Sequence, residues 1–276
     1  MKRGRIWFAS TTLLALQMLL VVTGGLVRVT GSGLGCPTWP KCTAESFIPT
    51  ESQSKIHTYI EFGNRMLTFA LFAAAIATLI TVWNRSELRR LAWFQFFGIF
   101  GQGILGGITV LTKLNPIPVA GHLLLSMVLI AGATTLQLKT TRYIALPDSW
   151  IAKLLACIGF ATLIAGTVVT GSGPHAGDWQ APRFDLNISH MAQIHGTLVA
   201  LTLALALYIA VKYPRGAANW LLAVIAGQGL IGLIQWWQGL PQALVGLHLL
   251  GASLFWFATW RTRLSFKYQQ LKGGKG

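Results

Sequence analysis

The sequence has few charged residues, and acidic residues are the scarcest. Only 11% of its 276 residues are charged, with 7 Asp and Glu against 22 Lys and Arg. Hydrophobic residues make up 53% of the chain, and the mean hydropathy is +0.57. A soluble domain carries about 25% charged residues, so the scarcity of charge excludes an ordinary soluble protein. It indicates an all-α polytopic membrane protein.

The chain also lacks the basic stripe of a nucleic-acid-binding protein. Its formal net charge is +15, but the basic residues stand at the ends of apolar runs and are not interleaved with aromatics. We therefore expect a lipid bilayer as partner and no nucleic acid. We expect no cleavable signal either, because the first apolar run is too long for one and no clean small-residue cleavage site follows it.

The apolar runs predict eight transmembrane helices. Each run has the length of about 20 residues that a helix needs to cross the hydrocarbon core. The predicted spans are Trp7 to Val27, Ile56 to Trp83, Leu91 to Leu111, Val119 to Leu138, Ile151 to Thr170, Ile188 to Val211, Trp220 to Trp237 and Leu244 to Trp260.

The loops between these spans alternate in basic content. Of the 22 basic residues, Arg65 lies within a span, and five lie in loops on one side of the membrane, which leaves sixteen for the other side. The five are Arg28, Lys41, Lys55, Lys113 and Arg183. By the positive-inside rule the richer side is cytoplasmic, and both termini are expected there.

An internal repeat divides the chain into two halves. Residues 101–106 (GQGILG) recur as 227–232 (GQGLIG), and His122-Leu-Leu recurs as His248-Leu-Leu at the same offset of 126. Residues 29–33 (VTGSG) recur as 169–173. We expect two parallel four-helix repeats, residues 1–145 and 146–276, related by an axis along the membrane normal. The glycines of the GQG motifs are assigned to close helix packing.

Histidines recur on the second and fourth spans. His57, His122 and His248 begin spans two, four and eight, and His195 lies two turns into span six, so all four fall toward the extracytoplasmic face. Facing helices that each contribute an imidazole can hold a haem through two axial nitrogens. The alternative for a single intramembrane histidine is an interhelical hydrogen bond. Zinc is disfavoured, since His-Glu-x-x-His and Cys-x-x-Cys are missing.

The start of the second span carries an ionisable stripe. At 3.6 residues per turn, His57, Glu61, Asn64 and Arg65 share one face. Because charge facing lipid is costly, this face must meet protein, ligand or water, and it suggests a site for an anionic, metal-containing ligand. Glu61 has two readings: a proton-transfer group beside such a ligand, or the partner of Arg65 in a helix-stabilising i, i+4 pair.

The loop after the first span holds Cys36 and Cys42, on the side where oxidation is allowed. A disulfide is favoured, and two free thiols or a redox-active pair are the alternatives. Arg28, just before this loop, either extends to the interface or binds a carboxylate such as a haem propionate.

The block from Gly24 to Cys42 (GGLVRVTGSGLGCPTWPKC), followed by His57 and by Ile60 to Arg65 (IEFGNR), resembles the bacterial haem A synthase family. The resemblance implies an enzyme of the bacterial inner membrane that oxidises the C8 methyl of haem O to a formyl group, giving haem A. The N-terminal half would hold haem O, supplied by a haem O synthase, and the C-terminal half a haem b cofactor. The electron partner is not identified.

The resemblance also implies residue roles. Glu61 would be catalytic, His57 and His122 would bind the substrate iron, and His195 and His248 would bind the cofactor iron. Arg28 and Arg65 are candidates for the propionates. One position departs from the family: many members read Glu-x-x-His-Arg where this chain has Asn64. In the first half, either His57 is then the axial iron ligand from this helix or the helix supplies no ligand.

Two other classes of function use some of the same features. A two-haem b-type electron-transfer cytochrome needs the same histidines but leaves Glu61 and the cysteine loop unexplained. A transporter would suit parallel repeats, but it predicts polar residues at the bilayer centre, whereas the ionisable groups here crowd the outer third of the spans.

Overall fold

The computed structural model describes residues 2–49, 56–141, 149–212 and 217–273. These ranges form helices and connecting loops, without strands. The helices are α1 (Lys2–Val29), α2 (Ile56–Val82), α3 (Ser86–Leu111), α4 (Pro116–Thr141), α5 (Trp150–Ser172), α6 (Ile188–Lys212), α7 (Ala218–Trp237) and α8 (Gln242–Gly273). Each is long and apolar enough to cross a membrane. The chain is a multi-pass membrane protein, and the predicted all-α class is confirmed.

Most helices extend the predicted spans by a few residues, α2 ends one residue before its predicted end at Trp83, and α8 departs furthest from its prediction. Its predicted end was Trp260, whereas the helix runs to Gly273. The part that is apolar enough to cross the bilayer ends at Ser265. No Gly or Pro interrupts the sequence between Trp260 and Leu271, so the helix continues after its apolar stretch ends.

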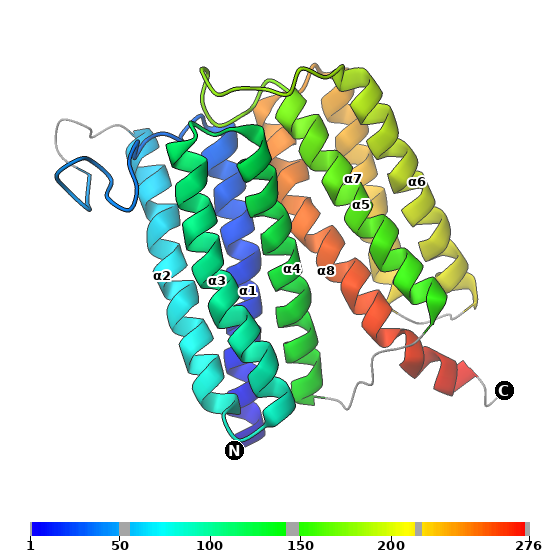
Figure 1. Cartoon of the computed structure of the whole chain (residues 1–276). Helices are drawn as coiled ribbons and strands as arrows, with labels where there is room; N and C mark the ends of the chain where they lie inside the picture. The colour runs from blue at the N-terminus through cyan, green and yellow to red at the C-terminus, as the bar shows by residue number, and fades with distance from the viewer. Residues whose placement is uncertain (1, 50–55, 142–148, 213–216, 274–276) are drawn as a thin grey trace.

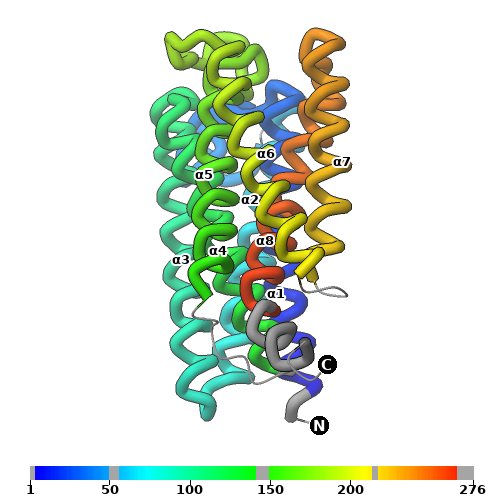
Figure 2. Tube along the Cα trace, turned by 90° about the vertical axis from the view of Figure 1, so that its right-hand side faces the viewer, coloured from blue at the N-terminus to red at the C-terminus, as the bar shows by residue number. Residues whose placement is uncertain are grey.

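The helices form two four-helix bundles side by side (Figure 1). In the first half α1 packs on α2, α2 on α3, α3 on α4 and α4 on α1, and α5 to α8 form the same ring in the second half. Contacts between the halves join α1 to α8, α4 to α8 and α4 to α5. Seen from the side, α6 and α7 lie on the face opposite the first half (Figure 2). The predicted domain boundary at 145/146 lies outside the described residues.

The backbone confirms that the two halves repeat each other. The loop from α3 to α4 has two residues with left-handed φ, Lys113 (52°) and Leu114 (61°), and the loop from α7 to α8 has Gly239 (74°) and Leu240 (63°). The hydrogen bonds match at the offset of 126: Leu114 N–H donates to Thr109 over 2.8 Å, and Leu240 N–H to Gln235 over 2.7 Å. A left-handed residue after the last helical turn is a common helix C-cap. The parallel repeat thus extends to the loops.

The halves are joined through a shared apolar core in which α8 is central. Trp256 lies in the cluster that also holds Met127 of α4 and Leu155 of α5. Its indole N–H donates to the Met127 carbonyl over 2.6 Å, and the Trp260 N–H donates to Thr135 Oγ1 over 2.8 Å. Indole N–H groups in an apolar core need such acceptors. These contacts fix the second bundle against the first.

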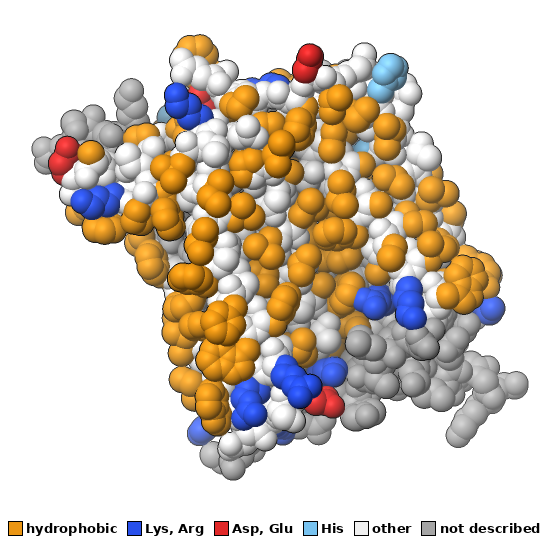
Figure 3. Space-filling model, in the orientation of Figure 1, with side chains coloured by type: hydrophobic (Ala, Val, Ile, Leu, Met, Phe, Trp, Pro, Cys, Tyr) orange, Lys and Arg blue, Asp and Glu red, His pale blue; other side chains and the backbone are white. Residues whose placement is uncertain are grey.

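The outer surface fits a bilayer. On the face shown in Figure 3, hydrophobic side chains cover the middle of the molecule, and Lys and Arg gather at its lower end. α1 begins and α8 ends at that same end (Figure 1). Arg89 and Lys139 belong to the basic end, where Lys139 pairs with Glu87 over 3.3 Å. The opposite end carries the loop with Cys36 and Cys42.

Candidate functional site

A cavity of about 610 Å³ lies inside the first half, toward the end that carries the cysteine loop. Its walls come from α1, α2, α3 and α4, with a smaller share from α5 and α8. Polar groups on the lining include Arg28, Glu61, Asn64, Arg65 and His122. The structure therefore brings four of the predicted site residues together with Asn64, from three helices. The volume and the few convergent polar groups are typical of a site for a small molecule or cofactor.

One side of the cavity is open. The lining residues Phe47, Ile48, Met66 and Phe69 are exposed, and Phe69 keeps 68% of its surface. They come from the outer loop and from the flank of α2. The exposed part of the lining is therefore apolar.

Glu61 lies buried in α2 with only 5% of its surface exposed. Its Oε1 accepts hydrogen bonds from the Arg65 guanidinium, at 2.6 Å from Nη2 and 3.2 Å from Nε. Its Oε2 accepts from the backbone N–H of Cys36 over 2.7 Å. Each carboxylate oxygen offers about two lone-pair directions, so Arg65 uses both directions of Oε1, and Cys36 uses one of Oε2. The i, i+4 pair and a role in the site therefore coexist.

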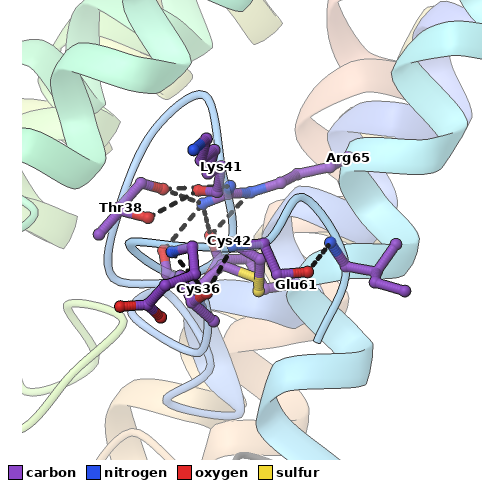
Figure 4. The surroundings of a disulfide bond; sticks show 10 residues. Cys36, Thr38, Lys41, Cys42, Glu61 and Arg65 are labelled. Carbon is purple, nitrogen blue, oxygen red and sulfur yellow. Dashed lines mark hydrogen bonds and ion pairs between the residues drawn. A yellow bond between two sulfur atoms is a disulfide. The ribbon is translucent and has the colours of Figure 1, made fainter. Parts of the chain in front are cut away.

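Arg65 connects α2 to the outer loop (Figure 4). Nη2 donates to the carbonyls of Cys36 (2.8 Å) and Thr38 (3.1 Å), and Nη1 donates to Thr38 and Lys41 (both 3.2 Å). The planar guanidinium has enough donors to hold these carbonyls and Glu61 at once. Arg65 thus fixes the cysteine loop over the cavity.

The predicted disulfide between Cys36 and Cys42 is present, with Cα atoms 4.4 Å apart. Both cysteines are fully buried. The bridge closes the loop that Arg65 holds, and the loop residue Trp39 reaches into the cavity lining. Its indole covers Gly107 of α3 so closely that a Cβ there would overlap the ring. Whether the bridge takes part in electron transfer stays a prediction.

His122 faces the cavity from α4. Its Nδ1 is buried without a hydrogen-bond partner in the described part of the chain. Gly106 of α3 lies against the ring, since a Cβ there would come within 3.2 Å of Cε1. The Gln102 amide donates to the His122 carbonyl (3.0 Å) and to Ser126 Oγ (2.7 Å), which fixes the backbone rather than the ring. An imidazole with no protein partner in a cavity is free to bind a ligand.

The close-packing role assigned to the GQG glycines was wrong. Cβ atoms built at Gly101, Gly103, Gly227 or Gly229 would meet nothing within 4 Å. The glycines against which neighbours pack are the last ones of the repeated motifs, Gly106 and its counterpart Gly232, which lies 3.3 Å from His248 Cε1 by the same measure. The repeated motif therefore makes room for an imidazole.

The second half brings His195 of α6 and His248 of α8 next to each other in a T-shaped arrangement. Their ring centres are 6.3 Å apart, and the rings are inclined at 83°. His195 Nδ1 lies 3.0 Å from the Thr162 carbonyl oxygen. Because a carbonyl only accepts, Nδ1 carries the proton, and the lone pair of the neutral ring is on Nε2. Metal-binding histidines commonly have this arrangement.

The spacing of these two rings fits an axial pair. An imidazole nitrogen binds a first-row metal at about 2.0–2.1 Å and lies about 1.2 Å from its ring centre, so a metal held between two rings puts their centres about 6.4 Å apart. The observed 6.3 Å agrees with this value. The spacing is therefore compatible with one metal ion between the two rings.

His57 does not line the cavity of the first half. Its side chain is exposed, and Nδ1 lies 2.9 Å from Ser32 Oγ, which in turn lies 2.7 Å from Thr30 Oγ1. The backbone carbonyl of His57 packs against Gly35. His57 thus lies outside the cavity that Glu61, Arg65 and His122 line. The sequence had predicted His57 on the same face of α2 as Glu61 and Arg65.

Asn64, and not the predicted His57, lies on the cavity lining. Thr23 Oγ1 of α1 donates to Asn64 Oδ1 over 2.6 Å. The sequence pattern placed Asn64 on the same face of the helix as Glu61 and Arg65, but gave it no role beyond its departure from the histidine of many family members.

Arg28 links the two halves at the outer end. Nε donates to the His175 carbonyl over 2.8 Å, and an Nη2 N–H donates to the Thr170 carbonyl over 3.0 Å. Both acceptors are backbone carbonyls of the second half, and neither carries a charge. Unlike the Arg65 charge, which Glu61 offsets, the Arg28 charge at the cavity wall stays available to an anionic group.

Comparisons with known proteins agree with these features. The sequence profile of COX15-CtaA, described as cytochrome oxidase assembly protein, matches residues 5–174. The heme A synthase of Shewanella oneidensis is 29% identical over 189 residues, which cover 60% of this chain and 55% of that protein. That of Lysinibacillus sphaericus is 34% identical over 176 residues, covering 60% and 56%. The chain thus spans little more than half the length of these curated relatives.

Proposed function

Because this chain belongs to the COX15-CtaA family of cytochrome oxidase assembly proteins, we propose that it is a membrane oxidoreductase that makes haem A. Its reaction converts the C8 methyl of haem O to a formyl group. The observation that carries this proposal is the cavity in which Glu61 of α2 and His122 of α4 meet beneath the disulfide loop. The relatives named heme A synthase support the substrate and product.

The second half is proposed to hold the haem b cofactor. The axial ligands are His195 and His248, whose ring spacing of 6.3 Å supports this assignment. Thr162 positions His195 by accepting its Nδ1 proton, so that Nε2 points away from α5. A haem in this place supplies one-electron transfer. A Cβ at Gly232 would lie 3.3 Å from His248 Cε1, and one at Gly166 would lie 3.2 Å from His195 Cε1, so glycine at both positions leaves room for the rings.

The first half is proposed to bind haem O. His122 is the imidazole on the cavity wall and binds the substrate iron, and the Arg28 charge attracts a propionate. Conversion of a methyl to a formyl group is a four-electron oxidation that inserts one oxygen atom, and any step in which a proton leaves the substrate is assisted by a base close by. Glu61 is the one carboxylate among the described lining residues. Arg65 keeps it oriented and prevents it from turning toward lipid.

The orientation proposed is that of the inner membrane with both termini in the cytoplasm. The termini lie at one end of the bundle, with Arg89, Lys139 and other basic residues, and the disulfide loop lies at the opposite end. Excess positive charge marks the cytoplasmic side, and disulfides persist outside it. Haem O then enters from the bilayer through the opening beside Phe69, delivered by a haem O synthase. The electron partner would act on the assembled enzyme.

Pigment analysis of the purified protein tests this function. Membranes that make haem O but not haem A should gain haem A when this chain is produced, and the purified protein should contain haem b with haem O or haem A. Haem b alone, without conversion of haem O, would point to an electron-transfer cytochrome. A protein without haem would point to the transporter class.

A further inference from the structure

The two halves differ at one position of their second helices. In the second half, His195 of α6 is hydrogen-bonded to the Thr162 carbonyl of α5. In the first half, Asn64 of α2 is hydrogen-bonded to Thr23 of α1. The repeat of residues 29–33 as 169–173 has an offset of 140, which relates Thr162 to Val22, the neighbour of Thr23. Asn64 and His195 thus contact corresponding stretches of the preceding helix, α1 and α5.

The opposite side of the site is the same in both halves. His122 and His248 are related by the offset of 126, and each rests against the last glycine of its repeated motif, Gly106 or Gly232. The imidazole on the fourth helix is therefore present twice, whereas the first half has Asn64, and not an imidazole, at the position of the second helix that contacts the preceding helix.

His57 is poorly placed to supply the missing imidazole. It lies seven residues before Asn64, which at 1.5 Å per residue is about 10 Å along α2. Its Nδ1 contacts Ser32, and the side chain is exposed outside the cavity lining. To reach the place of Asn64, it would have to leave Ser32 and pass Glu61 and the loop residue Cys36, which are hydrogen-bonded to each other.

Asn64 is itself a poor iron ligand. An amide nitrogen has no free lone pair, and Asn64 Oδ1, the acceptor atom, already takes the Thr23 hydroxyl hydrogen over 2.6 Å. The two amide N–H donors remain, on a side chain that lines the cavity. Such donors suit a small polar ligand rather than a metal ion.

We propose that the first-half site holds its haem through one imidazole, His122, and leaves the opposite face of the iron open beside Asn64. This inference rests on the proposed function, because it needs a haem in this cavity. The open face takes a small exogenous ligand such as carbon monoxide, cyanide or azide, and the Asn64 N–H groups donate to it. The second-half site, with His195 and His248, stays closed to such ligands.

The test uses the purified full-length protein, titrated with haemin until uptake ends. Haem per chain is counted, the spin state of ferric iron is read from electron paramagnetic resonance, and carbon monoxide binding to the reduced protein is read from difference spectra. We expect about half of the bound haem to be high-spin and to bind carbon monoxide. N64H should convert this fraction to low-spin haem that does not bind carbon monoxide, whereas N64Q should leave it unchanged.

His57→Ala is the deciding control, because that side chain lies outside the cavity lining. The proposal requires the high-spin fraction to be the same in His57→Ala and in the unsubstituted protein, even if N64H fails to fold. Two low-spin haems in the unsubstituted protein, one of which becomes high-spin in His57→Ala, would overturn the inference and leave the proposed function intact. A protein that takes up no second haem would overturn both.

Discussion

The backbone N–H of Cys36 donates a hydrogen bond to Glu61 Oε2 over 2.7 Å, so one end of a disulfide holds the buried carboxylate of the cavity. Arg65 completes the arrangement, since it binds the other oxygen of Glu61 and the carbonyl of Cys36. The geometry of the loop and the direction of the carboxylate are therefore coupled (Figure 4). The first two predictions follow from this coupling.

Loss of the bridge should impair the first half and spare the second. In C36S/C42S the loop loses its covalent closure, which stabilises a short loop by about 2 kcal/mol, and Glu61 loses a fixed donor. We expect haem O conversion to fall several-fold while the haem at His195 and His248 is retained. Conversion is measured by chromatography of extracted haems, and Cys157→Ser is the matched control, because that thiol is free and exposed. Equal loss of both haems would show that the bridge serves the whole fold instead.

Glu61→Gln should retain haem and lose conversion. The amide keeps the size of the side chain but accepts protons poorly, and removal of a positioned acid–base group costs about 10²–10⁴-fold in rate. The measurement is haem A formed per bound haem O over time. Glu87→Gln is the control, since that carboxylate is exposed and pairs with Lys139 at the opposite end. Haem A formation at the unsubstituted rate would exclude Glu61 from the chemistry.

A larger residue at Gly232 should displace His248. Because a Cβ there already approaches His248 Cε1 to 3.3 Å, Gly232→Val pushes the ring out of line with His195. Displacement of a metal ligand by its surroundings costs about 10–100-fold in affinity, which haem titration of the purified protein measures. Gly229→Val places the same side chain on the same helix, where a Cβ meets nothing within 4 Å. Similar haem affinity in the two variants would refute the role of Gly232.

Arg28→Met should loosen the outer contact between the halves. It removes two hydrogen bonds from a charged donor to the carbonyls of His175 and Thr170, worth about 3–6 kcal/mol together. We expect a lower temperature of thermal unfolding in detergent and a higher KM for haem O. Arg183→Met serves as control, because Arg183 also binds carbonyls, those of Gly173, Pro174 and Ala181, but within its own loop and away from the cavity lining. A KM unchanged by Arg28→Met would remove Arg28 from substrate binding.

The helices could be predicted because a bilayer imposes strict length and polarity on a chain that crosses it. The run from Ile188 predicted α6 to within one residue of its end at Lys212. The offset of 126 between His122 and His248 likewise predicted the repeat that appears again in the loops at Leu114 and Leu240. These signals are local or periodic, and the sequence displays both.

The cavity could be predicted only in part, because helical spacing does not fix the rotation of a helix against its neighbours. His57 and Asn64 share a stripe with Glu61 in the sequence, yet only Asn64 and Glu61 line the cavity. The difference comes from Ser32 and Gly35, loop residues that contact His57. No periodicity in α2 encodes that contact.

By itself, the sequence determined the membrane-spanning class, the number of helices and the duplication, and it favoured a disulfide between Cys36 and Cys42, since apolar length, charge and short-range spacing are encoded along the chain. The tertiary structure decided which side chains meet: His195 with His248, Thr23 with Asn64, and Arg28 with carbonyls about 140 residues away. Such contacts depend on how the two bundles turn and pack against each other, and that packing is a property of the whole molecule.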